Sequence, residues 1–156
     1  ESIILSPSAY DPSHILPFSS SVHIALIVDG IFSVTDGDRV EFEQRLGYHV
    51  DYYPVSSLMD YWKKVAPEDT DALVEEYKKL YTIKIDETGP EVYWEKVRNA
   101  ARAEIAIRRV LADEGATAFT TNFDDLGDAD VDNPNFVGFD QIPGLACQRL
   151  MAEGYG

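Results

Sequence analysis

One stretch limits the possible folds more than any other. The short strand pattern Thr117–Thr121 lies between two helical patterns, of which Pro90–Glu114 precedes it and ends at Gly115. The following helical pattern runs from Pro143 to Glu153. A strand between two helices along the chain is typical of a parallel sheet, because parallel strands need long crossover connections. Polar residues follow the strand directly, and the carboxyl ends of such strands usually face a ligand.

Two further segments have strand character. Val22–Val28 is a short continuous apolar run with β-branched residues, which predicts a strand buried on both faces. Tyr48–Val55 is rich in strand formers. Ile31–Val34 is either a second short strand or a continuation of the first, and periodicity does not separate the two. The sequence therefore predicts at least three strands.

The segments between these strands have helical patterns with recognisable ends. Thr35-Asp36 is the expected N-cap of a helix that ends at Gly47 and carries Val40, Phe42 and Leu46 roughly on one side. Ser56-Ser57 is the expected cap of the next helix, and Pro67 begins another with apolar residues at helical spacing. In the long helix the apolar residues from Val92 to Leu111 are expected to face mostly inward.

This alternation predicts an α/β fold. We expect a parallel-sheet three-layer sandwich of the doubly wound, Rossmann or flavodoxin-like type, with right-handed crossovers and helices on both faces. Residues 1–21 are rich in Ser and Pro and predict an extended arm or linker, so the domain proper is expected to span 22–156. The length of 156 residues and the 45% hydrophobic content suit one domain with one core.

Charge and cysteine content exclude several functions. A net charge of −15 argues against binding to nucleic acid or an anionic membrane, since both require clustered Lys and Arg. We find no apolar run of about 18 residues and no signal-peptide pattern, so the cytoplasm is the expected compartment. The single cysteine, Cys147, allows no internal disulfide, and its apolar helical setting favours a buried side chain over a nucleophile.

No metal site is predicted from residue spacing. His14, His23 and His49 are not spaced to meet at one metal from one helix, so each is expected in the arm, at a strand end or on the surface. Asp128-x-Asp130-x-Asp132 opens like a calcium loop. Its sixth position is Asn and its twelfth is Phe instead of the required Gly and Glu, which favours a solvated acidic loop.

The two carboxylates Asp124 and Asp125 follow the strand pattern Thr117–Thr121. Close carboxylates can act as an acid/base pair because they push their pKa values apart. Helix capping and loop hydrogen bonds explain the two residues as well. Both interpretations stay open.

The segments around this strand resemble the bacterial L-arabinose isomerases. The resemblance rests on Phe119-Thr-Thr-Asn-Phe-Asp-Asp-Leu126, on Gln141-Ile-Pro-Gly-Leu-Ala-Cys-Gln-Arg-Leu-Met151 and on Glu153-Gly-Tyr-Gly156. Shorter similar motifs, Val34-Thr-Asp-Gly-Asp-Arg-Val-Glu41, Arg45-Leu-Gly-Tyr-His-Val50 and Asp71-Ala-Leu-Val-Glu-Glu-Tyr77, occur in the same order, so the likeness covers about residues 34–156. The loop Gly127–Phe139 is longer than its family counterpart and is expected to protrude.

The resemblance implies an enzyme that converts L-arabinose to L-ribulose by proton transfer through an enediol. In this family two Glu and two His hold a divalent metal, typically manganese, and the first of them follows the Gly-Tyr-Gly motif. Catalytic and metal-binding residues are therefore expected beyond Gly156, and none is assigned within this chain. Of the sugar-pocket positions only Phe123 matches, as an apolar wall for the substrate, although core packing explains it equally well.

The expected function is thus the central domain of an aldose–ketose isomerase that is inactive as a fragment and binds no manganese by itself. The complete protein is expected to form a homo-oligomer and to bind an aldose such as L-arabinose. An alternative from another class is a non-catalytic sugar-binding or assembly domain with the same fold, since fold alone does not carry function.

Overall fold

The computed structural model describes residues 22–28, 38–122, 126, 139 and 143–155. The expected arm 1–21, the segment 31–34 and nearly all of the acidic loop 127–139 lie outside these residues. The described strands are β1 (Val22–Ile27), β2 (Tyr48–Tyr53) and β3 (Ala118–Thr121). They form one parallel sheet in the order β2-β1-β3. The expected α/β class with a parallel sheet is confirmed.

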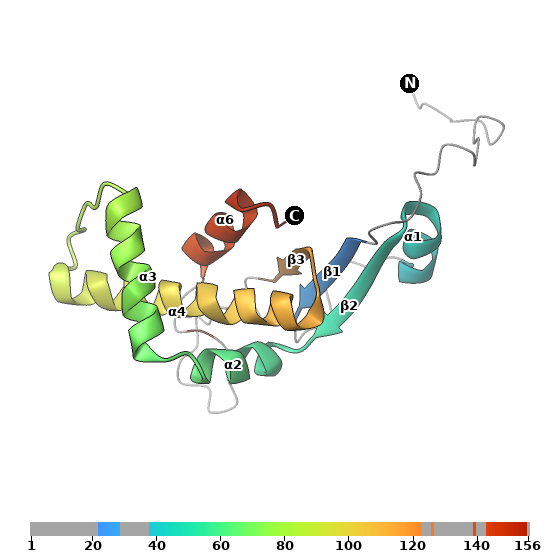
Figure 1. Ribbon diagram of the computed structural model, residues 1–156, viewed down its shortest axis with the longest axis horizontal. Coiled ribbons are helices and arrows are strands. Elements are labelled where there is room, and N and C mark those ends of the chain that lie inside the picture. The colour runs from blue at the N-terminus through green and yellow to red at the C-terminus, as the bar shows by residue number, and fades with distance from the viewer. Residues whose placement is uncertain (1–21, 29–37, 123–125, 127–138, 140–142, 156) are drawn as a thin grey trace, which may run out of the picture.

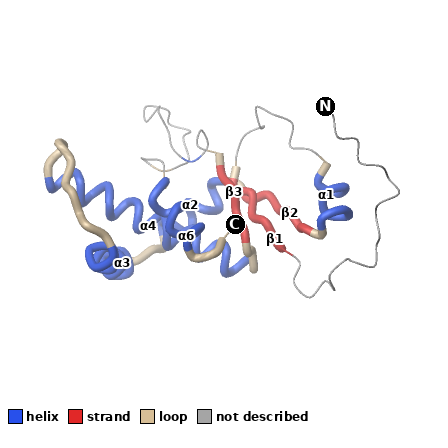
Figure 2. Tube along the Cα trace, turned by 90° about the horizontal axis from the view of Figure 1, so that it is seen from above, coloured by secondary structure: helices blue, strands red, loops and turns tan. Residues whose placement is uncertain are grey.

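Five helices among the described residues accompany the sheet (Figure 1). Their bounds are α1 Arg39–Leu46, α2 Val55–Lys63, α3 Pro67–Leu80, α4 Pro90–Glu114 and α6 Gly144–Ala152. Figure 2 shows α1 on one side of the three strands and α2, α4 and α6 on the other side. Helices on opposite sides are typical of right-handed crossovers when the strand order reverses, and here β2 and β3 lie on opposite edges of β1.

The long helix α4 organises the packing of the other helices. Helix α4 contacts α2, α3 and α6, and most of its buried residues lie in its middle and second half. The small residues Ala100, Ala103 and Ala106 are at most 6% exposed, which lets neighbouring elements approach closely. Gly115 ends the helix with a φ of 66°, a left-handed conformation that glycine adopts without strain.

The main core lies between α4 and the inner face of the sheet. It joins Ala25 and Ile27 of β1 to Leu58 of α2, Ile107 of α4 and Leu150 of α6, all at most 1% exposed. A smaller second cluster, Val74, Tyr77 and Ala101, lies between α3 and α4. None of the described helices is long and apolar enough to cross a membrane.

Two helix caps differ from the sequence-based expectation. Asp38, not Thr35-Asp36, caps α1, since its side chain accepts a hydrogen bond of 3.0 Å from the Glu41 backbone N–H. Helix α2 begins at Val55, directly after Pro54, and Ser56-Ser57 lie inside its first turn. Pro54 follows β2 with an extended backbone conformation and is the N-cap residue of α2. It makes no side-chain capping hydrogen bond.

Burial differs from the sequence-based expectation at Val92 and in the first half of β1, and α1 lies at the surface. Val40 and Leu46 of α1 are 64% and 55% exposed, and Val92 at the start of α4 is 43% exposed. No residue of α1 is buried. The strand β1 is fully buried only in its second half, so its first half is not covered on both faces. Aromatic contacts with β2 hold α1 instead, namely Phe42 with Tyr48 and Arg39 over the ring of Tyr52.

Candidate functional site

The carboxyl edge of the sheet is where an α/β domain of this type binds ligands. The strand register places the ends of β1, β2 and β3 level there, because Ile27 is paired with both Tyr53 and Thr121. Asn122 follows β3 directly at this edge. Phe123, the predicted sugar wall, is the next residue along the chain and lies outside the described residues, as do Asp124 and Asp125. The pocket role of Phe123 stays a prediction.

A second group of polar side chains lies toward the amino ends of β1 and β2. His23 is paired with His49 in the parallel register, and Asp51 follows on the same face of β2. The His23 and His49 rings are 5.4 Å apart between centroids. Asp51 Oδ2 lies 3.1 Å from the Nε2 atoms of both histidines. These three residues, the His23–His49–Asp51 cluster, have ligand atoms within 4.8 Å of one another.

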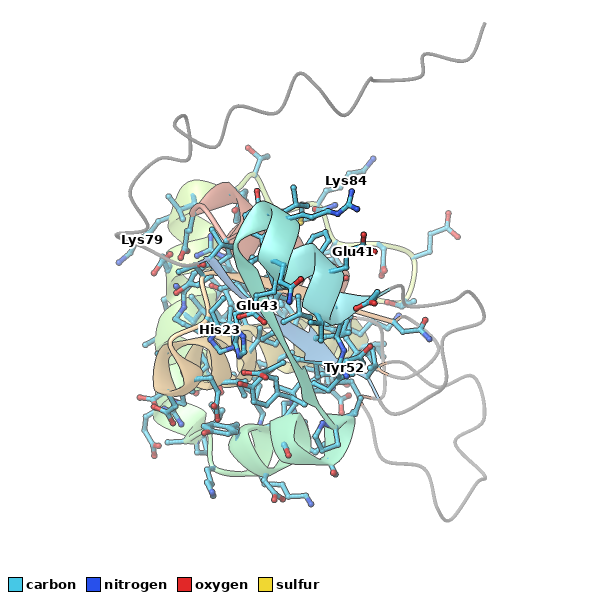
Figure 3. The ribbon with its side chains drawn as sticks, turned by 90° about the vertical axis from the view of Figure 1, so that its right-hand side faces the viewer. His23, Glu41, Glu43, Tyr52, Lys79 and Lys84 are labelled. Carbon is cyan, nitrogen blue, oxygen red and sulfur yellow. The ribbon has the colours of Figure 1, made fainter. Side chains whose placement is uncertain are left out.

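Oxygen acceptors fix the orientation of both imidazole rings. The Nδ1–H of His23 donates to the Glu114 backbone carbonyl at 3.1 Å, and Nδ1 of His49 lies 3.2 Å from Glu43 Oε1. Figure 3 shows His23 and Glu43 on the side of the molecule where α1 and β2 lie. The hydrogen bond to Glu43 and the charge of Asp51 raise the pKa of His49 above its ordinary value.

His23 and His49 lie near the ends of strands, as expected, but their contact was not predicted from the sequence. Helical spacing does not connect His23 with His49, and the separation of 26 positions along the chain hides their contact. The register of two parallel strands brings them together. A signal did exist, because each histidine is the second residue of a predicted strand, and adjacent parallel strands can align their second residues. His14 lies outside the described residues.

A third polar group, centred on Glu104, is buried between α3, α4 and α6. Glu104 has no exposed surface and accepts hydrogen bonds from Tyr77 Oη at 2.6 Å, Arg149 Nε at 2.8 Å and Arg108 Nη2 at 2.9 Å. Arg149 also donates to Glu76 at 2.8 Å and to Tyr81 Oη at 3.1 Å. We call these residues the Glu104 network.

The ionisation of the Glu104 network follows from these contacts. Hydrogen bonds to Glu153 and Glu104 raise the pKa of Arg108. Burial opposes the charge of Arg149, yet its hydrogen bonds to Tyr81 and Glu104 outweigh that effect and raise its pKa too. Burial and the bond to Glu104 raise the pKa of Tyr77, which therefore stays a neutral donor.

The network favours a structural role over a ligand site. The charged residues of the network line a surface groove together with Asp69 and Arg109, but each arginine of the groove already contacts a carboxylate. Sequence reasoning missed the network. The available signal was a Glu among the inward positions of the long helix, three residues before Ile107 and four after Ala100.

Cys147 agrees with its sequence-based interpretation. Its side chain is partly buried and packs against the main core, and burial raises the pKa of its thiol. A catalytic cysteine needs a lowered pKa and an electropositive setting. The residue therefore behaves as a small apolar side chain.

Comparison with known proteins connects these features to a family. Residues 30–156 match a family model described as the L-arabinose isomerase central domain. The chain is 56% identical over 126 residues to an L-arabinose isomerase of Bacteroides thetaiotaomicron and 55% identical over 126 residues to that of Phocaeicola vulgatus. Each alignment covers 80% of this chain and 24% of the relative. L-arabinose isomerase 1 of Clostridium acetobutylicum is 39% identical over 140 residues, which cover 88% of this chain and 27% of that protein.

Proposed function

We propose, from the premise that this chain belongs to the L-arabinose isomerase central-domain family, that it forms the central domain of an aldose–ketose isomerase. The observation that carries the proposal is the match over residues 30–156, which includes β2, β3 and the five described helices. The chain spans about a quarter of the length of the relatives it matches. The reaction proposed for the complete protein is the conversion of L-arabinose to L-ribulose.

The sheet supports a positioning role for the domain in that reaction. The carboxyl ends of its three strands are level, and Phe123 is the second residue after β3 in the sequence. An apolar wall orients a sugar by contact with its C–H face, and accurate positioning can lower a reaction barrier by several kcal/mol. In this proposal Phe123 contributes orientation, and no residue of the chain transfers the proton.

The manganese of the family does not fit the donor groups of the described residues. Among the described residues, the group with metal-ligand spacing is the His23–His49–Asp51 cluster, which offers two imidazoles and one carboxylate. The family set contains two glutamates, whereas Glu43 is engaged at Nδ1 of His49. The cluster also lies four positions along β1 from the carboxyl edge, about 13 Å away. The manganese is proposed to bind outside these residues.

A domain exchange tests the proposal. In the Bacteroides thetaiotaomicron enzyme, residues 30–156 of this chain would replace the matching segment, and L-ribulose formation from L-arabinose would be measured with manganese present. We expect turnover within about tenfold of the unmodified enzyme. We also expect that the 156-residue chain alone forms no ketose. A correctly folded exchange protein without activity, or turnover by the isolated chain in the ordinary enzymatic range of roughly 1–1000 per second, would contradict the proposal.

The role of Phe123 is tested in the same exchange protein. Phe123→Gln should alter the ratio of kcat/KM values for L-arabinose and a stereoisomeric aldose more than it alters thermal stability. Phe119→Gln is the matched control, because Phe119 lies on β3 and packs against the core. The control should lose stability and keep the sugar ratio. An unchanged ratio in Phe123→Gln would leave Phe123 as a packing residue.

A further inference from the structure

We propose that His23, His49 and Asp51 bind a divalent cation of the zinc type. The three side chains are brought together by the parallel register of β1 and β2, with His23 directly opposite His49 and Asp51 on the same face. They stand at the amino ends of the strands, away from the edge assigned to the sugar. The proposal concerns cation binding by this chain and does not depend on isomerase activity.

The strongest observation is the state of His23 Nε2. This atom is buried and has no hydrogen-bond partner among the described residues, although Asp51 Oδ2 is 3.1 Å away. The carbonyl of Glu114 can only accept, so the proton of the neutral imidazole is placed on Nδ1. The lone pair on Nε2 is then buried, without a donor, beside the Asp51 carboxylate. A cation bound between the two groups, either a proton or a metal ion, removes the repulsion between them.

His49 has a carboxylate partner at both ring nitrogens. Its Nδ1 faces Glu43 Oε1 and its Nε2 faces Asp51 Oδ2. In metal sites the ligating imidazole usually donates its other N–H to a carboxylate or a backbone carbonyl, which fixes the ring and the tautomer. Both histidines have such a partner, a carbonyl for His23 and a carboxylate for His49. The outer contacts of a metal site are therefore present around all of its imidazole ligands.

The distances suit a small transition metal. Tetrahedral zinc with ligands at about 2.0–2.1 Å separates neighbouring ligand atoms by about 3.3 Å. The two distances from Asp51 Oδ2 are 3.1 Å, and all three ligand atoms lie within 4.8 Å of one another. Imidazole nitrogen suits zinc better than manganese or calcium, which prefer oxygen ligands.

The surroundings leave one coordination position open to solvent. The His49 and Asp51 side chains are 47% and 45% exposed, so a cation can enter from solvent. The His23 side chain is only 16% exposed and forms the inner wall of the site. Three protein ligands and one exchangeable position are the arrangement found in zinc sites that bind water or a further ligand.

Zinc titration of the untagged, metal-free protein tests the proposal. We expect saturable binding of one zinc ion per chain at micromolar or lower concentration, measured by calorimetry near neutral pH. His49→Gln and Asp51→Asn should each weaken that binding at least tenfold, and Glu43→Gln by about tenfold through its contact with His49. Cobalt added in place of zinc should give the visible absorption of a tetrahedral nitrogen–oxygen site.

Asp60→Asn is the matched control for Asp51→Asn. Asp60 lies on α2, is 68% exposed and pairs with Lys63, so the substitution removes the same charge away from the cluster. It should leave zinc affinity within about twofold.

Equal binding by wild type, His49→Gln and Asp51→Asn would show that the cation binds elsewhere, for example in the acidic segment 127–139, and would overturn the proposal. Absence of saturable binding to the folded protein would overturn it as well. Because the exchanged residues are half exposed, circular dichroism should show the wild-type fold in both variants.

Discussion

At the scale of single residues, one carboxylate holds three helices together. Glu104 lies on α4 and accepts from Tyr77 on α3 and Arg149 on α6 in addition to its own-helix partner Arg108. All of this occurs at a fully buried position. A buried charge is stable only while its partners remain, because water cannot replace them.

Glu104→Gln should therefore be strongly destabilising. It leaves the charge of Arg149, whose residue is only 8% exposed, without its main buried partner, and the expected loss is about 3–5 kcal/mol. Urea unfolding followed by circular dichroism measures the effect. Asp71→Asn is the control, since it breaks the exposed ion pair with Arg98 and should change stability by about 0–1 kcal/mol. Similar losses in both variants would contradict the importance assigned to the network.

At the scale of elements, the ends of the helices depend on particular backbone conformations. Gly115 ends α4 at a φ of 66°, whereas Gly144 occupies the first position of α6 without a left-handed φ. Neither position has a neighbouring atom within 4 Å of an added Cβ. Because neither added Cβ would meet a neighbouring atom, a difference between alanine substitutions at the two positions reports backbone strain.

Alanine at these two positions should have opposite effects. Gly115→Ala forces a Cβ into the left-handed region and should cost about 1 kcal/mol. Gly144→Ala reduces the freedom of the unfolded chain and should stabilise the protein by about 0.5 kcal/mol. Thermal unfolding of both variants measures the difference. A loss at Gly144 equal to that at Gly115 would show that the conformation of α6 differs from the one described.

The elements were largely predictable from the sequence, and their caps less so. A continuous apolar run identified β1, a high content of strand formers identified β2, and helical spacing with Pro90 and Gly115 gave the bounds of α4. The cap of α1 was placed too early because Thr35, Asp36 and Asp38 are all good caps, and composition alone does not choose among neighbouring candidates.

At the scale of the whole molecule, stability is unevenly distributed. Helix α1 has no buried residue and contacts the described structure mainly through β2. Helix α4 and the second half of β1 lie in the main core. Local unfolding requires the least free energy where few apolar contacts are lost.

Hydrogen exchange should follow this distribution. We expect the amides of α1 to exchange fastest among the described helices and those of Ala100–Leu111 in α4 to exchange slowest. Exchange measured by mass spectrometry on the native protein gives the order. Protection of α1 equal to that of α4 would indicate a partner surface on α1 that covers its exposed Val40 and Leu46.

The sites were harder to predict than the fold because they depend on how the elements of the whole molecule are arranged. The contact of His23 with His49 depends on which strands are neighbours and on their register, and neither follows from local periodicity. The Glu104 network likewise joins residues up to 73 positions apart, as for Arg149 and Glu76. Motif spacing detects ligands on one element and misses those that meet only in the assembled sheet or bundle.

The convergence of three helices on Glu104 also limits how this protein can change over generations. Replacing Glu104 alone leaves Arg149 with only Glu76 and Glu153 as carboxylate partners, and replacing Arg149 alone leaves Glu104 buried with only Arg108 as a cationic partner. A matched apolar set at both positions can nevertheless be as stable or more stable. Descendants that lack the ion pair must therefore cross an unstable intermediate or acquire a compensating stabilising substitution first. The order of mutations, more than the final sequence, then decides which variants can arise.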